Sequence, residues 1–311
     1  MSERKYAREN HGSDYSVHLK GVFMKILAIG EIIFDIFNGE AEIGGAPLNF
    51  CAHCAAVGAK SAIVSAVGGD SLGARALKHL EDFGVDTAFV AENGYTTGQC
   101  LVTVKNGNPE YNVLRPTAYD KIEISDDMLK KIKEYGADVF EFGTLIQRDA
   151  VSREAVNKIL SSCSFSDVFC DVNLRSGCYD EESCRCCLEN ASILKISSEE
   201  EPLLAEFGLY ECGASDKDTV LNICAAFKNI KLVLLTKGEN GSIIYDKTNG
   251  KFYDIPAVET EVVATVGAGD SYSAAFLCEY FKNGDIEAAG KAGAELSAFV
   301  VAHREAVPSK A

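Results

Sequence analysis

Near its carboxyl end the chain has the sequence Thr265-Val266-Gly267-Ala268-Gly269-Asp270-Ser271, followed by an apolar stretch over residues 272–281. This order predicts a strand-like approach, a tight turn of small residues and then a helix. Glycines let backbone N–H groups converge without side chains in the way, and the N-terminus of a helix adds partial positive charge. The segment therefore predicts an anion hole built from the backbone of Gly267, Ala268 and Gly269.

Asp270 falls in the first turn of that helix, so its carboxylate stands beside the anion hole. A carboxylate would repel the ligand of a pocket that only bound phosphate. The arrangement suits a carboxylate that takes a proton from an attacking hydroxyl while the hole stabilises phosphoryl charge. The alternative is a simple charge at a helix start, which stabilises a helix by about 0.3–1 kcal/mol.

Short β-rich runs alternate with helical patterns along most of the chain. The β-rich runs span Lys25–Ile29, 61–67, Val139–Phe142, 168–171, 193–196 and Leu232–Thr236, and the helical patterns span 47–57, 72–83, 150–160, 199–207 and 218–227. Ser125 is expected to cap a further helix over 128–135. Continuous apolar strands are buried on both faces, so the pattern predicts an α/β fold whose helices cover a mostly parallel central sheet.

Two stretches are poor in helical signals, at about residues 32–43 and 94–115. They contain alternating runs, for example around the turn Asn106-Gly107-Asn108-Pro109, and predict hairpins inserted into the α/β body. A small sheet at the ligand-binding edge would act as a lid, and the alternative is decoration of the sheet edge. Residues 1–23 are polar and unpatterned, so we expect a disordered or non-native leader before one domain over 24–311.

The composition is that of an ordinary globular protein, with 311 residues, 47% hydrophobic and 24% charged, and a net charge of −16. The acidic balance argues against nucleic acid as a partner, because phosphate contacts need an excess of Lys and Arg. No stretch approaches the roughly 20 apolar residues of a membrane helix, and no signal peptide is evident. We therefore expect a cytoplasmic protein without a membrane partner.

The twelve cysteines are expected to be buried small hydrophobes, although the spacing in Cys51-Ala52-His53-Cys54 leaves a metal or redox role open. Neither a GxxxxGK[ST] motif nor a protein-kinase catalytic loop is present. Gly68-Gly69-Asp70-Ser71-Leu72-Gly73 lacks the spacing of a dinucleotide turn. The anion hole is therefore neither that of a P-loop enzyme nor that of a protein kinase.

Two motifs together resemble those of the ribokinase-like (PfkB) carbohydrate kinases, and among them the fructokinases. Gly44-Gly45-Ala46-Pro47-Leu48-Asn49 is similar to the family's N-terminal signature, and the segment ending in Asp270 is similar to its C-terminal one. Two motifs in the right order, about 220 residues apart, are more specific than either alone. Further similarities, from about residue 24 to 308, are Gly30-Glu31 with Asp35, Asp171-Val172-Asn173-Leu174-Arg175, Thr236-Lys237-Gly238-Glu239-Asn240-Gly241, Phe142-Gly143-Thr144-Leu145, and Arg115 with Tyr119-Asp120.

The resemblance implies a three-layer α/β/α ribokinase-like fold with a small β-sheet lid. It also implies ATP-dependent phosphorylation of the primary hydroxyl of a small sugar, with fructose converted to fructose 6-phosphate, ATP and Mg²⁺ as cofactors, and a homodimer formed through the lid. Two alternatives stay open. One is a 2-keto-3-deoxygluconate kinase or another sugar kinase on the same scaffold, and the other is a non-catalytic sugar-binding relative.

The resemblance also implies roles for individual residues. Asp270 would be the general base beside the anion hole of Gly267, Ala268 and Gly269. The sugar and the transferred phosphoryl group would contact Asp35, Gly45, Asn49, Arg115, Asn173 and Arg175. The nucleotide would contact Ser197, Glu200, Thr236, Lys237, Gly238 and Gly241, with Glu200 also organising Mg²⁺ through water. The alternative for the charged members is a solvated surface position or a surface ion pair.

Two positions depart from the family pattern. Ala264 stands where family members have an Asp that holds a monovalent cation, which puts potassium activation in doubt. Ser197 replaces the Asn of the family's NxxE element, here Ser197-Ser198-Glu199-Glu200. A hydroxyl can still bind one water, although it offers fewer hydrogen-bonding groups than an amide. Neither change removes Asp270 or its glycines.

Overall fold

The central sheet of this computed structural model, which describes residues 24–105 and 108–308, has nine strands in the order β13-β12-β11-β10-β9-β8-β1-β4-β5. Neighbours from β5 to β11 pair in parallel, and β12 and β13 run antiparallel at one edge. The strands are β1 (Lys25–Ile29), β4 (Lys60–Gly68), β5 (Val90–Asn93), β8 (Val139–Phe142), β9 (Asp167–Asp171), β10 (Ile193–Ser197), β11 (Leu232–Thr236), β12 (Ser242–Asp246) and β13 (Lys251–Ile255).

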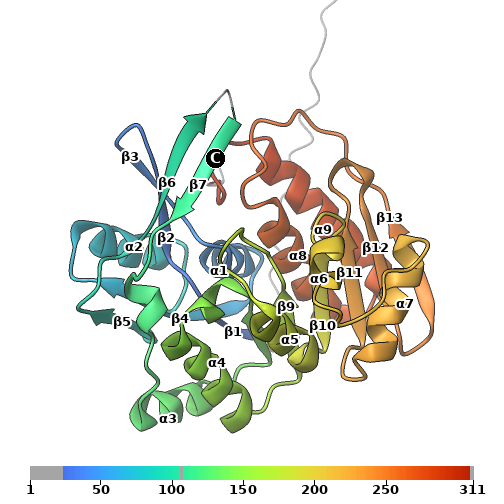
Figure 1. Cartoon of the computed structure of the whole chain (residues 1–311), viewed down its shortest axis with the longest axis horizontal. Helices are drawn as coiled ribbons and strands as arrows, with labels where there is room; N and C mark the ends of the chain where they lie inside the picture. Colours follow the sequence, from blue (N-terminus) through green and yellow to red (C-terminus); the bar gives the residue numbers. More distant parts are fainter. Residues whose placement is uncertain (1–23, 106–107, 309–311) are drawn as a thin grey trace, which may run out of the picture.

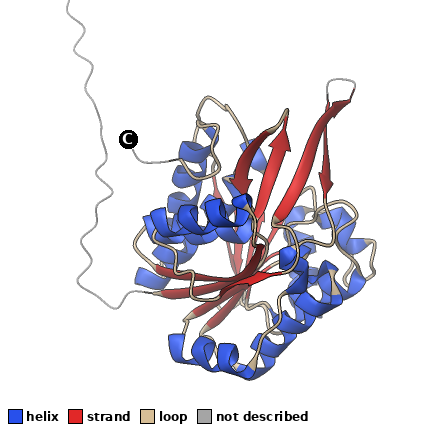
Figure 2. Ribbon diagram, turned by 90° about the vertical axis from the view of Figure 1, so that its left-hand side faces the viewer, coloured by secondary structure: helices blue, strands red, loops and turns tan. Residues whose placement is uncertain are grey.

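Helices cover both faces of this sheet, as Figures 1 and 2 show. In β1, Ile26 and Ala28 point into one apolar cluster, and Leu27 and Ile29 point into the other. The first cluster packs under α1 (Ala46–Ala56), α2 (Ser71–Asp82), α8 (Ala268–Asn283) and α9 (Ile286–Val301). The second packs under α3 (Asp126–Tyr135), α4 (Ala150–Ser162), α5 (Glu181–Asn190), α6 (Glu201–Ala205) and α7 (Asp216–Ala226). The predicted three-layer α/β/α architecture is confirmed.

A second, four-stranded sheet projects from the body (Figure 1), in the order β3-β2-β6-β7. It consists of β2 (Ile33–Phe37), β3 (Glu40–Gly44), β6 (Gly98–Lys105) and β7 (Asn108–Val113). The two hairpins fall within the stretches predicted to form them, and parallel pairing of β2 with β6 joins them into one sheet. We call these four strands the lid sheet, and its function as a lid stays a prediction.

Several local expectations are confirmed and others are wrong. Ser125 does cap α3, because its hydroxyl accepts a hydrogen bond from the Met128 N–H at 3.1 Å. The helix expected over 199–207 is only the short α6, which ends before the left-handed Gly208. The expected strand-like approach at residues 265–266 is a loop. The leader over 1–23 and residues 106–107 of the expected turn lie outside the described residues.

The sequence patterns missed β12, β13 and α9. The two strands are short and follow a turn, and α9 is rich in Ala and Gly, which weakens its periodic signal. None of the helices in the described ranges is long and apolar enough to span a membrane. Within those ranges the cysteines are free thiols, most of them buried, and no group of three His, Cys, Asp or Glu side chains has the geometry of a metal site.

The fold brings several predicted site residues to one edge of the sheet. Asp171, Ser197 and Thr236 are the last residues of β9, β10 and β11, three neighbouring parallel strands. In open α/β sheets, ligands bind in the crevice outside the carboxyl ends of such strands. The N-terminus of α8 lies against the same edge, because Gly269 packs on Lys195 of β10.

Candidate active site

The residues predicted to form an anion hole lie at the start of α8. Gly267 is the N-cap, with φ +79, and a Cβ atom there would lie 2.6 Å from the Ala306 carbonyl oxygen, so this position requires glycine. The Ala268 N–H donates to the Thr265 carbonyl at 3.3 Å. Within the described part of the chain, the N–H groups of Gly269 and Asp270 have no acceptor, as is usual in the first turn of a helix. These amides are available to an anion.

Asn49 connects the two sequence motifs. It lies on α1, whose N-cap is Gly45, where φ is +115 and a side chain would collide with the Glu31 carbonyl oxygen. The Asn49 Nδ2 atom donates to Asp270 Oδ2 at 2.8 Å. The motifs that lie far apart in the sequence therefore meet in one hydrogen bond between α1 and α8.

The surroundings of Asp270 act on its pKa in opposite directions. Burial raises the pKa, whereas the Asn49 hydrogen bond and the charges of Lys195 and Arg175 lower it, and the net pKa is above the ordinary value. A carboxylate whose pKa is raised by burial is a stronger proton acceptor than an exposed one, and Asn49, Lys195 and Arg175 favour its ionised form.

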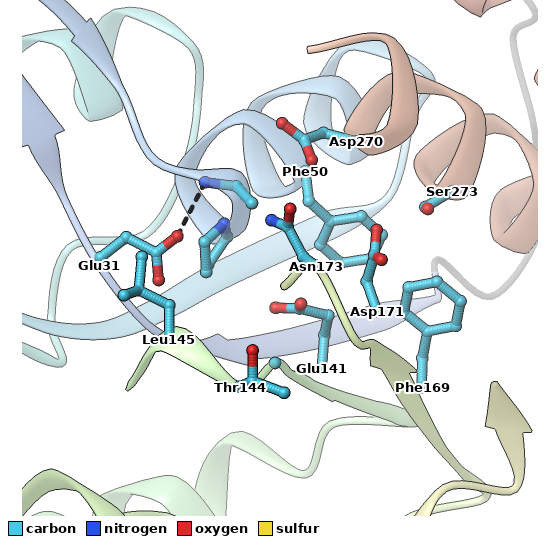
Figure 3. Close-up of a pocket in the computed structure, with 13 residues that line it drawn as sticks. Glu31, Phe50, Glu141, Thr144, Leu145, Phe169, Asp171, Asn173, Asp270 and Ser273 are labelled. Carbon is cyan, nitrogen blue, oxygen red and sulfur yellow. Dashed lines mark hydrogen bonds between the residues drawn. The ribbon is translucent and has the colours of Figure 1, made fainter. Parts of the chain in front are cut away.

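A cavity beneath Asp270 is lined by further carboxylates, and Figure 3 shows Glu31, Glu141, Asp171 and Asp270 around it. Glu31 Oε1 accepts from the Ala46 N–H at 3.2 Å, and burial raises the pKa of Glu31 to about 7. Burial also raises the pKa of Glu141 well above its ordinary value. Glu141 Oε2 and Asp171 Oδ1 are buried and have no hydrogen-bond partner among the described residues.

Asp171 and Lys195 form a buried ion pair across β9 and β10. The two residues are opposite each other in the parallel register, and Lys195 Nζ donates to Asp171 Oδ2 at 2.7 Å. Burial raises the pKa of Asp171 to about 6, against the attraction of Lys195. Sequence reasoning did not single out Lys195 or Glu141. The available signal was one charged residue inside each of two otherwise apolar strands, Ile193–Ser197 and Val139–Phe142.

Three of the predicted sugar-contact residues face the same region. Asp35 lies on β2 of the lid sheet, and burial raises its pKa, while a hydrogen bond from Cys100 and the charge of Arg175 lower it. The exposed Arg175 guanidinium also acts on Glu31 and Asp270. Asn173 lines the cavity with a left-handed backbone, φ +43 (Figure 3). The structure therefore brings Asp35, Asn173 and Arg175 together with Asp270.

Arg115 is placed differently from these residues. Its side chain is exposed, and its electrostatic effect is on Asp149, whose pKa it helps to lower, at the N-cap of α4. The buried guanidinium of this region is instead that of Arg148, which contacts Asp120 Oδ1 through Nε at 2.6 Å and donates to the Leu114 carbonyl at 2.7 Å. No contact in the described residues joins Arg115 to the cavity.

The predicted nucleotide residues follow β10 and β11. Ser197 and Thr236 are opposite each other in the register. Gly238 begins a short 3₁₀ turn, η3 (Gly238–Asn240), and Gly241 follows it with φ +78 against the backbone after β13. Lys237 is held in an ion pair, with Nζ 2.6 Å from Asp216 Oδ2.

Glu200 is the residue predicted to organise Mg²⁺, and its carboxylate is fixed in place by the chain. Oε1 accepts from the Leu174 N–H at 2.7 Å, and Oε2 accepts from the Ser197 N–H at 2.8 Å and the Ser197 hydroxyl at 2.9 Å. These three bonds leave about one lone pair, on Oε1, for a water ligand. Mg²⁺ usually keeps several waters and binds through one or two carboxylates plus substrate phosphates, so Glu200 fits an indirect role.

Ala264 offers only backbone groups to a cation, and its N–H is already donated to the Val301 carbonyl at 3.2 Å. Whether potassium activates the protein stays a prediction of the sequence analysis.

The chain is similar to several known sugar kinases. An uncharacterized sugar kinase of Pyrococcus horikoshii, PH1459, is 28% identical over 279 residues, covering 84% of each chain. Its structure in complex with ATP matches this fold with a TM-score of 0.75 at 26% identity, covering 91% of this chain and 94% of that one. A "probable fructokinase-5" of Arabidopsis thaliana is 28% identical over 287 residues, covering 84% of each chain.

A 5-dehydro-2-deoxygluconokinase of Listeria monocytogenes is 27% identical over 271 residues, covering 83% of this chain and 80% of its own. The relatives thus differ in the sugar that their names give. Residues 27–310 match the model of the pfkB family of carbohydrate kinases. This chain, with its α1 and α8 motifs joined at Asn49 and Asp270, belongs to that family of sugar kinases.

Proposed function

We propose that this kinase transfers the γ-phosphoryl group of ATP to the primary hydroxyl of a small neutral sugar, with fructose as the leading substrate and fructose 6-phosphate as its product. The observation that carries the proposal is the Asp270 carboxylate, which Asn49 holds at 2.8 Å beside the unpaired amides of the first turn of α8. A base and an anion hole side by side are what phosphoryl transfer to an alcohol requires.

In the proposed reaction, Asp270 accepts the proton of the sugar hydroxyl as its oxygen attacks the γ-phosphorus in line, and ADP leaves. The amides of Gly269 and Asp270 bind the oxygens of the transferring group. Glu200 would hold Mg²⁺ through water, and bound Mg²⁺ supplies positive charge that offsets the phosphate oxygens. The lid sheet, through Asp35, would orient the sugar and keep out water that otherwise hydrolyses ATP.

The electrostatics of the cavity favour a neutral sugar over a sugar acid. Four carboxylates surround the cavity, and Lys195 is already paired with one of them. Arg115 does not line the cavity, and Arg175 is the cation whose charge acts on both Asp35 and Asp270. Burial raises the pKa of Glu31 and Glu141, so the like charges that a substrate carboxylate would meet here are mainly those of Asp35 and Asp270. A 2-keto-3-deoxygluconate kinase, or a kinase acting like the Listeria relative, remains the second candidate because Arg175 is exposed toward the site.

The test is an ADP-release assay over fructose, ribose, 2-keto-3-deoxygluconate and 5-dehydro-2-deoxygluconate, with KCl or choline chloride as the salt. We expect the highest kcat/KM with fructose and little difference between the salts. Asp270→Asn should lower kcat by about 10²–10⁴-fold, because it removes the base but keeps the shape. The exposed Asp127→Asn is the matched control and should leave kcat unchanged.

Each result bears on a different part of the proposal. Turnover of Asp270→Asn near that of the wild type would remove the base assignment. A higher kcat/KM with either acid would replace fructose by a sugar acid. Binding of sugar and ATP by calorimetry without any ADP release would make the chain a non-catalytic sugar-binding protein.

A further inference from the structure

Lys195 is a buried cation that the proposed reaction has not yet used. Only 5% of the residue is exposed, and it is the one fully buried lysine among the residues that the structure describes. It interrupts the apolar strand β10. Burying an ammonium group carries a desolvation penalty of several kcal/mol, so its place in the core needs a reason.

The ion pair with Asp171 accounts for only part of the bonding capacity of Lys195. An ammonium group has three N–H donors, and Asp171 Oδ2 at 2.7 Å is its hydrogen-bond acceptor within the described residues. Asp171 Oδ1 has no partner there either. A pair with unsatisfied hydrogen bonds on both sides is a poor way to stabilise a core, because replacing a buried pair with apolar residues is often neutral or stabilising.

The position of the ammonium group connects Lys195 to the reacting centre. A Cβ atom added at Gly269 would lie 3.1 Å from Lys195 Nζ, so the charge packs against the first turn of α8 at Gly269. Asp171, Glu200 and Asp270 attract this ammonium group and raise its pKa, in that order, against desolvation. Lys195 thus remains charged, next to the backbone that would bind the phosphoryl oxygens and near the base.

We propose that Lys195 is a positioning residue whose buried charge keeps Asp270 ionised and strengthens the anion hole at Gly269. The inference rests on the proposed function, in which Asp270 is the base. Lys195 acts through Asp270 and the α8 backbone, because it does not line the cavity. A built-in ammonium group also supplies positive charge at this site without a bound monovalent cation.

The groups that face Asp270 set the direction of the expected pH effect. Asn49 on α1, Lys195 on β10 and Arg175 after β9 favour its ionised form. Glu31 and Glu141 are acids that interact with Asp270 in the opposite sense, as does Asp171. Removing Lys195 therefore raises the pKa of Asp270, and the acidic limb of kcat/KM moves to higher pH.

The experiment compares Lys195→Met, Lys195→Gln and the double variant Asp171→Asn/Lys195→Met across pH 5–9. The double variant removes both charges of the pair, so no uncompensated buried charge remains and its fold is preserved. We expect kcat at pH 7 to fall by about 10²-fold in all three. The acidic limb should move up by roughly one pH unit or more in the two single variants. In the double variant it should move up by less, because the opposing charge of Asp171 is also removed, but it should stay above that of the wild type.

A merely structural role predicts something different. If Lys195 only neutralises Asp171, the double variant regains the kcat and the acidic limb of the wild type, which overturns the inference. Lys231→Met is the matched control, because Lys231, which directly precedes β11, pairs with Asp167 at the start of β9 at 3.0 Å. This pair does not line the cavity, so the variant should leave both readouts unchanged. Thermal melts check that each variant is folded. If the double variant does not fold, Lys195→Gln, which keeps a hydrogen-bond donor for Asp171, tests the inference instead: an acidic limb like that of the wild type would overturn it.

The same assay separates this inference from the proposed function. If Asp270→Asn retains turnover, the base assignment fails and the role of Lys195 fails with it. If Asp270→Asn is inactive and the three Lys195 variants keep the acidic limb of the wild type, only the role of Lys195 is wrong.

Discussion

Asn49 shows how one side chain can serve both the fold and the reaction. Its Nδ2 atom donates to Asp270, while its Oδ1 atom is buried without a partner among the described residues. An unsatisfied buried acceptor costs about 1–3 kcal/mol. A hydroxyl donor of the sugar would satisfy this oxygen, so the structure gives a physical reason for placing Asn49 among the sugar contacts.

We predict that Asn49→Ala shifts the acidic limb of kcat/KM to higher pH. The amide hydrogen bond favours ionised Asp270, so its loss raises the pKa of Asp270 further above the ordinary value. The ratio of variant to wild-type activity should therefore be smaller at pH 6 than at pH 8.5, and KM for the sugar should rise. The exposed Asn190→Ala is the control, and a ratio independent of pH would count against the assignment.

At the scale of the elements, strand β8 carries a carboxyl group into the core. Glu141 is 4% exposed, and its pKa is raised mainly by burial and also by the nearby acids Glu31, Asp171 and Asp270. The unfolded chain would release this proton near its ordinary pKa of 4.5, whereas the folded chain holds it to higher pH. A folded state that binds more protons loses stability as the pH rises.

Thermal stability should therefore fall between about pH 4.5 and 7, the interval over which Glu31 also changes from its ordinary pKa to about 7. Glu141→Gln replaces the titrating carboxyl group by an amide of the same shape, which does not ionise. Its Tm should therefore exceed that of the wild type at pH 8 and match it near pH 4.5. The control Glu134→Gln, at an exposed position, should show the same dependence of Tm on pH as the wild type. Equal Tm losses at both pH values would contradict this explanation.

At the scale of the whole molecule, the face of the lid sheet that carries Asp35 also carries exposed aromatic side chains. Phe37 lies two residues after Asp35 on β2, so the two side chains share one face of the sheet. Cys100 is paired with Asp35, Val102 lies two residues after Cys100, and Tyr111 is paired with Val102, so Tyr111 belongs to the same face. Phe37 and Tyr111 are 45% and 61% exposed. Exposed sheets with apolar side chains favour pairing with another chain, so we keep the prediction of a homodimer formed through the lid sheet.

Light scattering after gel filtration tests this prediction. The wild type should elute as a species of twice 33.4 kDa, the mass of one chain. Phe37→Ser combined with Tyr111→Ser should shift it to the monomer without changing the Tm appreciably, because both side chains are exposed. Leu221→Ser, on an exposed position of α7, serves as the control. A wild type that already elutes as a monomer would refute the dimer.

Much of the fold and part of the site could be predicted from local patterns. The apolar runs of β1, β8 and β11 mark buried parallel strands, because each run is determined by burial on both faces. The turn at Gly267 identified the start of α8, because few residues other than glycine adopt its left-handed backbone so close to Ala306. In contrast, the Ala- and Gly-rich α9 has too weak an apolar period to predict.

The sequence by itself determined the alternation of buried strands and helices, the turn of small residues before α8 and the carboxylate in its first turn, since these depend on the preferences of neighbouring residues. The tertiary structure alone decided that Asn49 reaches Asp270, that Lys195 pairs with Asp171 next to Gly269, and that Arg115 does not line the cavity. Such contacts join segments 24 to 221 residues apart. They follow from strand order and helix packing, which no local pattern encodes.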